Sequence, residues 1–77
     1  MKQYVDVIAY HDQYDRVTPL YIVWDTGIKY SVDKVLKIER AASLKYGGVG
    51  LRYTVRIHGQ MRWLYYENPK WFIEKIE

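Results

Sequence analysis

The chain has 77 residues, of which 12 are Lys or Arg, 9 are Asp or Glu, none is Cys and 17% are aromatic. This length indicates one domain over residues 1–77, and the lack of cysteine excludes disulfide bonds and thiolate metal sites. No apolar run reaches the roughly 20 residues of a membrane helix, and the charged N-terminal residues lack the apolar segment of a signal peptide. We therefore expect a cytoplasmic protein without membrane association, held together by side-chain packing alone.

Alternating apolar and polar residues, divided by turn residues, predict seven short strands. The expected strands cover residues 3–10, 19–24 and 28–32, a segment within 31–40, the two arms of a hairpin over 49–66, and 71–76. Residues 31–40 are ambiguous, because Ser31 ahead of an apolar group could begin a short helix. A strand that follows a tight turn near Asp33 is the interpretation we favour. The last turn is Asn68-Pro69-Lys70, with proline in its second position.

The turn between the second and third strands, Asp25-Thr26-Gly27, fits a three-residue hairpin loop that ends in a left-handed glycine. This register places three apolar pairs on one face: Trp24 with Ile28, Ile22 with Tyr30, and Leu20 with Val32. Short strands joined by turns predict an all-β fold, either a small SH3-like antiparallel barrel or a strongly curled sheet. The expected core consists of Val5, Val7, Leu20, Ile22, Trp24, Ile28, Tyr30, Leu36, Ile38, Tyr53, Val55 and Ile57.

The hairpin over 49–66 has two possible registers. A two-residue turn at His58-Gly59 suits the glycine. It would place on one outer face the side chains of Arg52, Thr54, Arg56, Met61, Trp63 and Tyr65. A three-residue loop would shift the second arm by one position, so that Trp63 enters the core and Arg62 turns outward. Turn chemistry favours the first register and hydrophobicity the second, and we adopt the first.

The outer face of this hairpin is the main candidate binding site. Residues 1–39 hold five basic and six acidic side chains, whereas residues 40–77 hold seven and three, which gives net charges of −1 and +4. Arginine pairs with phosphate through a planar fork, and aromatic rings stack on unpaired bases. A nucleic-acid site would use Arg52, Arg56, Trp63 and Tyr65, with Lys45 and Arg62 as additional cations. The same residue types also form cross-strand cation–π pairs that only stabilise a sheet.

Two other patterns are candidates for catalytic or metal sites. Asp25-Thr26-Gly27 resembles the active-site triplet of retroviral-type aspartic proteases, in which two Asp residues meet across a homodimer. The large residue after Gly27 and the C-terminal sequence depart from that family, so a hairpin turn is the simpler interpretation. His11, Asp12 and Asp15, with the distant His58, lack the spacing of a structural zinc site. We therefore expect no enzymatic activity, no cofactor and no metal.

The runs TPLYIVWDTGIKYSVDKVL and AASLKYGGVGLRYTVRI, with the closing Trp71-Phe72 strand, resemble a group of short bacterial proteins of no known activity. The resemblance implies a small β-domain and assigns no functional residues. Our leading expectation is a non-enzymatic binding or adaptor module of the bacterial cytoplasm. Its partner would be a protein or a second copy of the chain, which covers a strand edge or an aromatic patch. The alternative is binding of single-stranded nucleic acid or RNA, and a homodimeric protease is a remote third.

Overall fold

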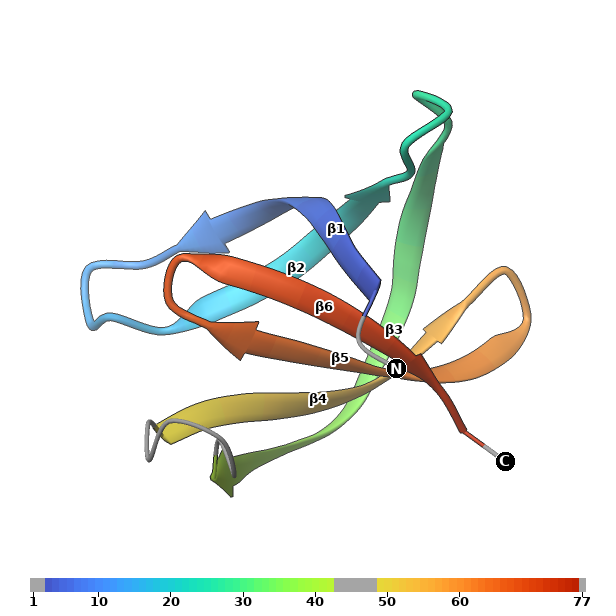
Figure 1. Ribbon diagram of the computed structural model, residues 1–77. Coiled ribbons are helices and arrows are strands. Elements are labelled where there is room, and N and C mark those ends of the chain that lie inside the picture. The colour runs from blue at the N-terminus through green and yellow to red at the C-terminus, as the bar shows by residue number, and fades with distance from the viewer. Residues whose placement is uncertain (1–2, 43–48, 77) are drawn as a thin grey trace.

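The computed structural model describes residues 3–42 and 49–76, which form six strands and no helix. The strands are β1 (Gln3–His11), β2 (Val17–Val23), β3 (Lys29–Ala42), β4 (Val49–Ile57), β5 (Gln60–Glu67) and β6 (Lys70–Lys75). Each strand pairs antiparallel with the next, and β6 returns to β1, so the sheet closes into a barrel (Figure 1). The predicted all-β class and small SH3-like barrel are confirmed. No helix in the described ranges could cross a membrane.

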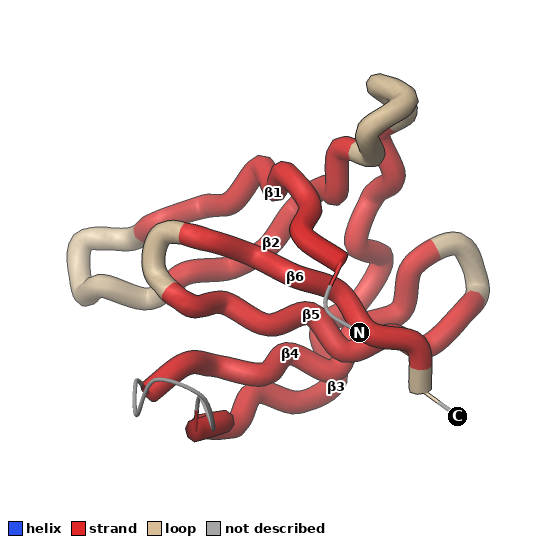
Figure 2. Tube along the Cα trace, in the orientation of Figure 1, coloured by secondary structure: helices blue, strands red, loops and turns tan. Residues whose placement is uncertain are grey.

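The third predicted strand and the one after it are a single long strand, β3. Its pairing with β4 shifts register twice, once between Val32 and Lys34 and again between Val35 and Lys37. Each shift leaves one extra residue, and such bulges bend a strand without ending it. The prediction of a tight turn near Asp33 is therefore wrong, and so is the count of seven strands. Figure 2 shows this strand as one uninterrupted red tube from the upper loop to the lower edge of the barrel.

The core lies inside the barrel and is built from alternate residues of all six strands. Its buried members are Ile22, Tyr53, Val55, Ile57, Leu64 and Trp71. Eight of the twelve predicted core residues are buried or pack against this cluster. Four predictions are wrong, because the side chains are largely exposed: Leu20 (41%), Ile28 (52%), Leu36 (45%) and Ile38 (54%).

The bulges explain two of these four errors. In the β1–β2 ladder, Ile8 pairs with Tyr21 and Ala9 with Pro19, which leaves Leu20 as an extra residue. Leu36 is the extra residue of the second bulge in β3. An extra residue shifts the inward–outward alternation of all side chains that follow it in the strand. An apolar residue that strict alternation would place inside the barrel can therefore point outward. The period-2 rule cannot place such residues.

Two turns match their predicted geometry. Gly27 has φ of 85°, and the Gly27 N–H donates to the Trp24 carbonyl at 2.8 Å, as a hairpin loop ending in a left-handed glycine requires. His58 and Gly59 have φ of 50° and 73°, and Ile57 pairs with Gln60, so the two-residue turn and the first register are confirmed.

The last turn differs from its prediction. Glu67 pairs with Lys70, which places Asn68 and Pro69 at the two central positions of the turn. Proline is therefore third in this turn and not second. The turn still joins β5 to β6 as a tight hairpin, and it lies beside the C-terminal half of β1 (Figure 1).

Strands β1 and β2 form a ribbon whose described backbone pairing with the rest of the barrel is confined to one end, where β1 begins and β2 ends. Among the described residues, the pairing of β2 with β3 is confined to Tyr21–Val23, and the pairing of β1 with β6 to Gln3–Val5. Within the ribbon the two strands stay paired from Asp6 to His11. Beyond these pairs β2 leaves β3, as the cyan strand in Figure 1 shows, and β1 has no further described pairing with β6.

Candidate interaction surface

One outer row of side chains crosses five strands of the barrel. Backbone pairing places Glu39 opposite Arg52, Arg52 opposite Tyr65, Tyr65 opposite Phe72, and Phe72 opposite Tyr4. We call these five residues the outer ladder. Directly opposed side chains in a sheet are close enough to interact. The row is therefore a continuous series of cross-strand contacts on the outside of β3, β4, β5, β6 and β1.

The residues of the outer ladder contact one another, and Arg52 also contacts the neighbouring Trp63. The Arg52 guanidinium donates to the Glu39 carboxylate at 2.7 Å and lies 4.6 Å from the ring centroid of Trp63. The rings of Tyr65 and Phe72 stack at 4.5 Å with an interplanar angle of 8°, and Tyr4 meets Phe72 edge-on at 5.9 Å. Only 4% of Phe72 is exposed, although it lies outside the barrel. The Arg52 Nε is also buried and has no hydrogen-bond partner in the described part of the chain.

The ionisation of this pair follows from the same contacts. The hydrogen bond from Arg52 lowers the pKa of Glu39 from its ordinary value, and hydrogen bonds with Glu39 and then Tyr65 raise the pKa of Arg52. Both groups are thus held in their charged forms, each neutralised by the other. A guanidinium that is already paired with a carboxylate and stacked on an indole has little capacity left for an incoming phosphate.

The sequence-predicted site residues are not all brought together. Arg52, Arg56, Trp63 and Tyr65 share the outer face, as the register required. Arg56 is exposed and makes no ion pair among the described residues. Arg62 lies on the opposite side, where it pairs with Val55 and lines a pocket of about 330 Å³ at one mouth of the barrel. Lys45 lies outside the described residues.

The outer face of the β1–β2 ribbon is apolar and exposed. Ile8 and Tyr10 from β1 are 45% and 60% exposed, and Leu20 and Tyr21 from β2 are 41% and 36% exposed. Ile8 is directly opposite Tyr21, so the two strands present their apolar residues side by side. We call these four residues the ribbon patch. None of these four residues was predicted as a site. The sequence did contain a signal for the patch, because the run from Tyr4 to Tyr10 is apolar on both faces of the strand apart from Asp6.

A cleft of about 830 Å³ lies between the ribbon and the turn that joins β5 to β6. It is lined by Tyr4, Val5, Asp6, Val7, Ala9, His11, Tyr66, Asn68, Pro69, Lys70 and Trp71. Val5, Val7 and Ala9 are the inward-facing residues of β1, and they pack against the core. The cleft therefore has an apolar floor and a rim that carries both positive and negative side chains.

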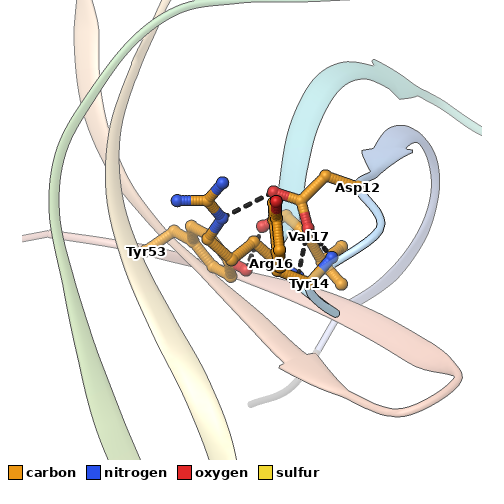
Figure 3. Close-up of polar contacts among 5 residues, drawn as sticks. All are labelled: Asp12, Tyr14, Arg16, Val17 and Tyr53. Carbon is orange, nitrogen blue, oxygen red and sulfur yellow. Dashed lines mark hydrogen bonds and ion pairs between the residues drawn. The ribbon is translucent and has the colours of Figure 1, made fainter.

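Four hydrogen bonds, three to Asp12 and one from Tyr53, fix the far end of the ribbon (Figure 3). The Asp12 carboxylate accepts the backbone N–H groups of Tyr14 and Arg16 at 2.8 and 2.9 Å, and the Arg16 side chain at 2.5 Å. These bonds, led by the Arg16 backbone, lower the pKa of Asp12. The buried Tyr53 hydroxyl donates to the Val17 carbonyl at 2.5 Å and so joins β4 to β2 where β3 has diverged. Within the described ranges, no group of three or more His, Cys, Asp or Glu side chains could hold a metal ion.

The triplet Asp25-Thr26-Gly27 forms the exposed turn between β2 and β3. It stands at the end of the projection that carries this hairpin away from the barrel in Figure 1. Comparison with protein-family models, with curated proteins and with solved structures finds no match to this chain. The resemblance to short bacterial β-domain proteins therefore stays a prediction, and the function has to be argued from the surface itself.

Proposed function

We infer that the protein is a non-enzymatic interaction module that binds another polypeptide through the β1–β2 ribbon. The observation that carries this inference is the ribbon patch, in which four large apolar side chains are exposed on two paired strands. Contiguous exposed apolar surface on a small domain is typical of protein interaction sites. Tyrosine also adds binding energy at low cost in side-chain entropy, which makes it common at such sites.

The outer ladder supports this choice by contrast. Its aromatic and arginine residues have the composition of a binding site, but their ring faces and hydrogen-bonding groups already contact one another. Binding there would have to replace internal contacts. Among the described residues, the ribbon patch has no comparable contact to lose apart from the Lys29 ammonium, which lies 4.5 Å from the Tyr21 ring centroid.

Site-specific photocrosslinking in living cells tests this function. A photoreactive phenylalanine analogue at Tyr10 should give a discrete crosslinked polypeptide, whereas the same analogue at Lys34, which is exposed on the outside of β3, should not. Introducing Ile8→Asp should remove the Tyr10 crosslink. Equal crosslinking from both positions, or crosslinking to nucleic acid alone, would rule the proposal out.

A second candidate is single-stranded nucleic acid, favoured by one observation. Arg56 is opposite Lys34 on the outside of the β3–β4 ladder, and neither makes an ion pair in the described part of the chain. Neighbouring unpaired cations can bind phosphate, and such binding weakens steeply with salt. An oligonucleotide shift at low salt that disappears with Arg56→Ala but survives Arg16→Ala would support this candidate. No shift at low salt would exclude it.

A further inference from the structure

The edge of β1 that faces away from β2 has no described partner strand along its second half. β1 pairs with β6 only as far as Val5, and from Asp6 to His11 its described pairing is with β2 alone. A strand exposes the N–H and C=O groups of every second residue along each edge. The second half of β1 therefore presents a row of backbone donors and acceptors toward the cleft, over a length of roughly 20 Å at the usual rise per residue.

The cleft beside this edge has the shape and chemistry of a groove for one strand. Tyr66 and Trp71 form part of its floor, with ring centroids 4.4 Å apart, and the inward face of β1 continues the floor. On the other side of the edge lie Ile8 and Tyr10 of the ribbon patch. A strand laid along β1 would place one set of alternate side chains on the floor of the cleft and the other set beside Ile8 and Tyr10.

We propose that the partner's binding segment is an extended, mostly apolar peptide that adds to the free edge of β1 as an extra strand. This proposal rests on the function inferred above and specifies how the partner binds. Main-chain hydrogen bonds to the edge supply affinity, and pockets for alternate side chains supply specificity. The added strand runs antiparallel to β1, in the direction of β6, because antiparallel pairing is the more stable arrangement and is the one used throughout this barrel.

A single strand fits this groove better than a second copy of the chain. If a second copy bound here, its β1 would be the added strand. That β1 is already paired with its own β2 along Asp6–His11, so the second copy's β2 would also need space next to the added strand. That space is bordered by the turn at Asn68 and Pro69, which lines the cleft. Asp6, His11 and Lys70 at the rim make no ion pair among the described residues, so the groove can accept charged residues at the ends of the segment.

The test uses a phage-displayed library of random octapeptides selected against the full chain, with the Ile8→Asp variant as the counter-selection target. Selected peptides should be apolar at alternate positions. The best peptide is then synthesised in two forms, with alternate backbone amides N-methylated in one frame or in the other. One frame should weaken binding at least tenfold, because it removes the N–H groups that face β1, and the other frame should leave binding nearly unchanged.

Amide hydrogen exchange locates the added strand. Peptide binding should slow exchange at amides within Asp6–His11 and leave those of Leu36–Arg40 unchanged, a matched control because that part of β3 also lacks a β2 partner. Protection of Leu36–Arg40 would overturn the proposal. If both methylated forms bind equally, recognition is through side chains only, and the strand proposal fails while the interaction function stands. If no peptide is selected although Tyr10 crosslinks a polypeptide, the partner binds as a folded surface and the strand proposal again fails.

Self-association is the remaining outcome. Sedimentation of the chain alone should give a monomer at micromolar concentration. A dimer that protects Asp6–His11 without peptide would make a second copy the occupant and would overturn the proposal.

Discussion

The outer ladder and the ribbon patch are both aromatic surfaces of the same barrel, but they differ in what their side chains contact. In the outer ladder, Phe72 is almost completely covered, and Tyr65 stacks on it in parallel. In the ribbon patch, Ile8 and Tyr10 are about half exposed. The difference shows that composition alone does not tell whether an aromatic surface is exposed. Aromatic rings that pack against their own sheet stabilise the fold, whereas exposed rings leave apolar surface in contact with solvent.

The largest expected effect is the loss of Phe72 from the outer ladder. Phe72→Ala should lower the free energy of unfolding by about 3 kcal/mol, since it deletes a covered aromatic ring and leaves Tyr65 and Tyr4 without their contact. Urea denaturation gives the value, and Phe72→Leu, which keeps most of the volume, should cost about 1 kcal/mol. If Phe72→Ala lowers the free energy of unfolding no more than Tyr10→Ala does, the two surfaces contribute equally to stability and the comparison fails.

The next effect concerns the hydrogen bond that joins the β1–β2 ribbon to β4. Tyr53→Phe removes the hydroxyl that bonds the Val17 carbonyl and should cost about 1 kcal/mol. Tyr30→Phe is the control, because its hydroxyl makes no hydrogen bond in the described ranges. Hydrogen exchange should become faster in the ribbon with Tyr53→Phe and stay unchanged with Tyr30→Phe. Equal acceleration across all strands would show that the bond has no special role at the ribbon.

The pH dependence of the free energy of unfolding at alkaline pH tests the role of Tyr53 in another way. Burial raises the pKa of Tyr53, so the folded state favours the neutral phenol. The corresponding contribution to stability is complete below the unfolded-state pKa near 10 and is lost as pH rises through the higher folded-state pKa. The wild-type chain should therefore lose stability above about pH 10 more steeply than Tyr53→Phe does. Parallel curves would contradict this assignment.

A smaller effect is expected for the charge pair of the outer ladder. Because Arg52 lowers the pKa of Glu39, the contribution of this pair is complete above the ordinary Glu pKa of 4.5 and is lost as pH falls through the lower folded-state value. Glu39→Gln should flatten the acid limb of the stability curve below pH 4.5. Arg52→Met combined with Glu39→Gln should cost less than the two single changes added together. Strict additivity would show that the pair is not coupled.

The smallest effect on stability is expected in the ribbon patch. Ile8→Thr and Tyr10→Thr keep strand-forming residues at exposed positions, so each should change the free energy of unfolding by about 0.5 kcal/mol or less. Ile8→Thr should abolish crosslinking from the photoreactive residue at position 10, and both changes should abolish the binding of selected peptides. A ribbon-patch variant that lowers the free energy of unfolding by as much as Phe72→Ala, yet still binds the selected peptides, would contradict this comparison.

The sequence predicted the local parts of this fold well. The turns at Gly27 and at His58-Gly59 depend on residues that tolerate positive φ, and this preference can be read from a few neighbouring positions. The inner face of β4 also followed from alternation. Leu20 and Leu36 could not be placed in the same way, because a bulge is selected by how the whole barrel bends and not by the residues beside it.

The candidate site was harder to predict than the fold, for a physical reason. Arg52, Trp63 and Tyr65 were correctly grouped on one face, since register alone decides that. Whether they are available depends on Glu39 and Phe72, which reach them from other strands. Conversely, Ile8 and Tyr10 form an exposed patch because none of the described strands covers the outer face of the ribbon, which is a property of the assembled barrel.

The attachment of the ribbon also constrains how the chain folds. β3, β4 and β5 pair through long ladders between neighbours in sequence, whereas closure of the barrel pairs Gln3 with Ile73. Contacts between residues far apart in sequence carry a larger loop-closure entropy and form more slowly than local hairpins. The short β1–β6 ladder is therefore the expected last step of folding. We expect the hairpins to form before the barrel closes. At that stage one edge of β6 and one edge of β1 would be open to any extended polypeptide nearby.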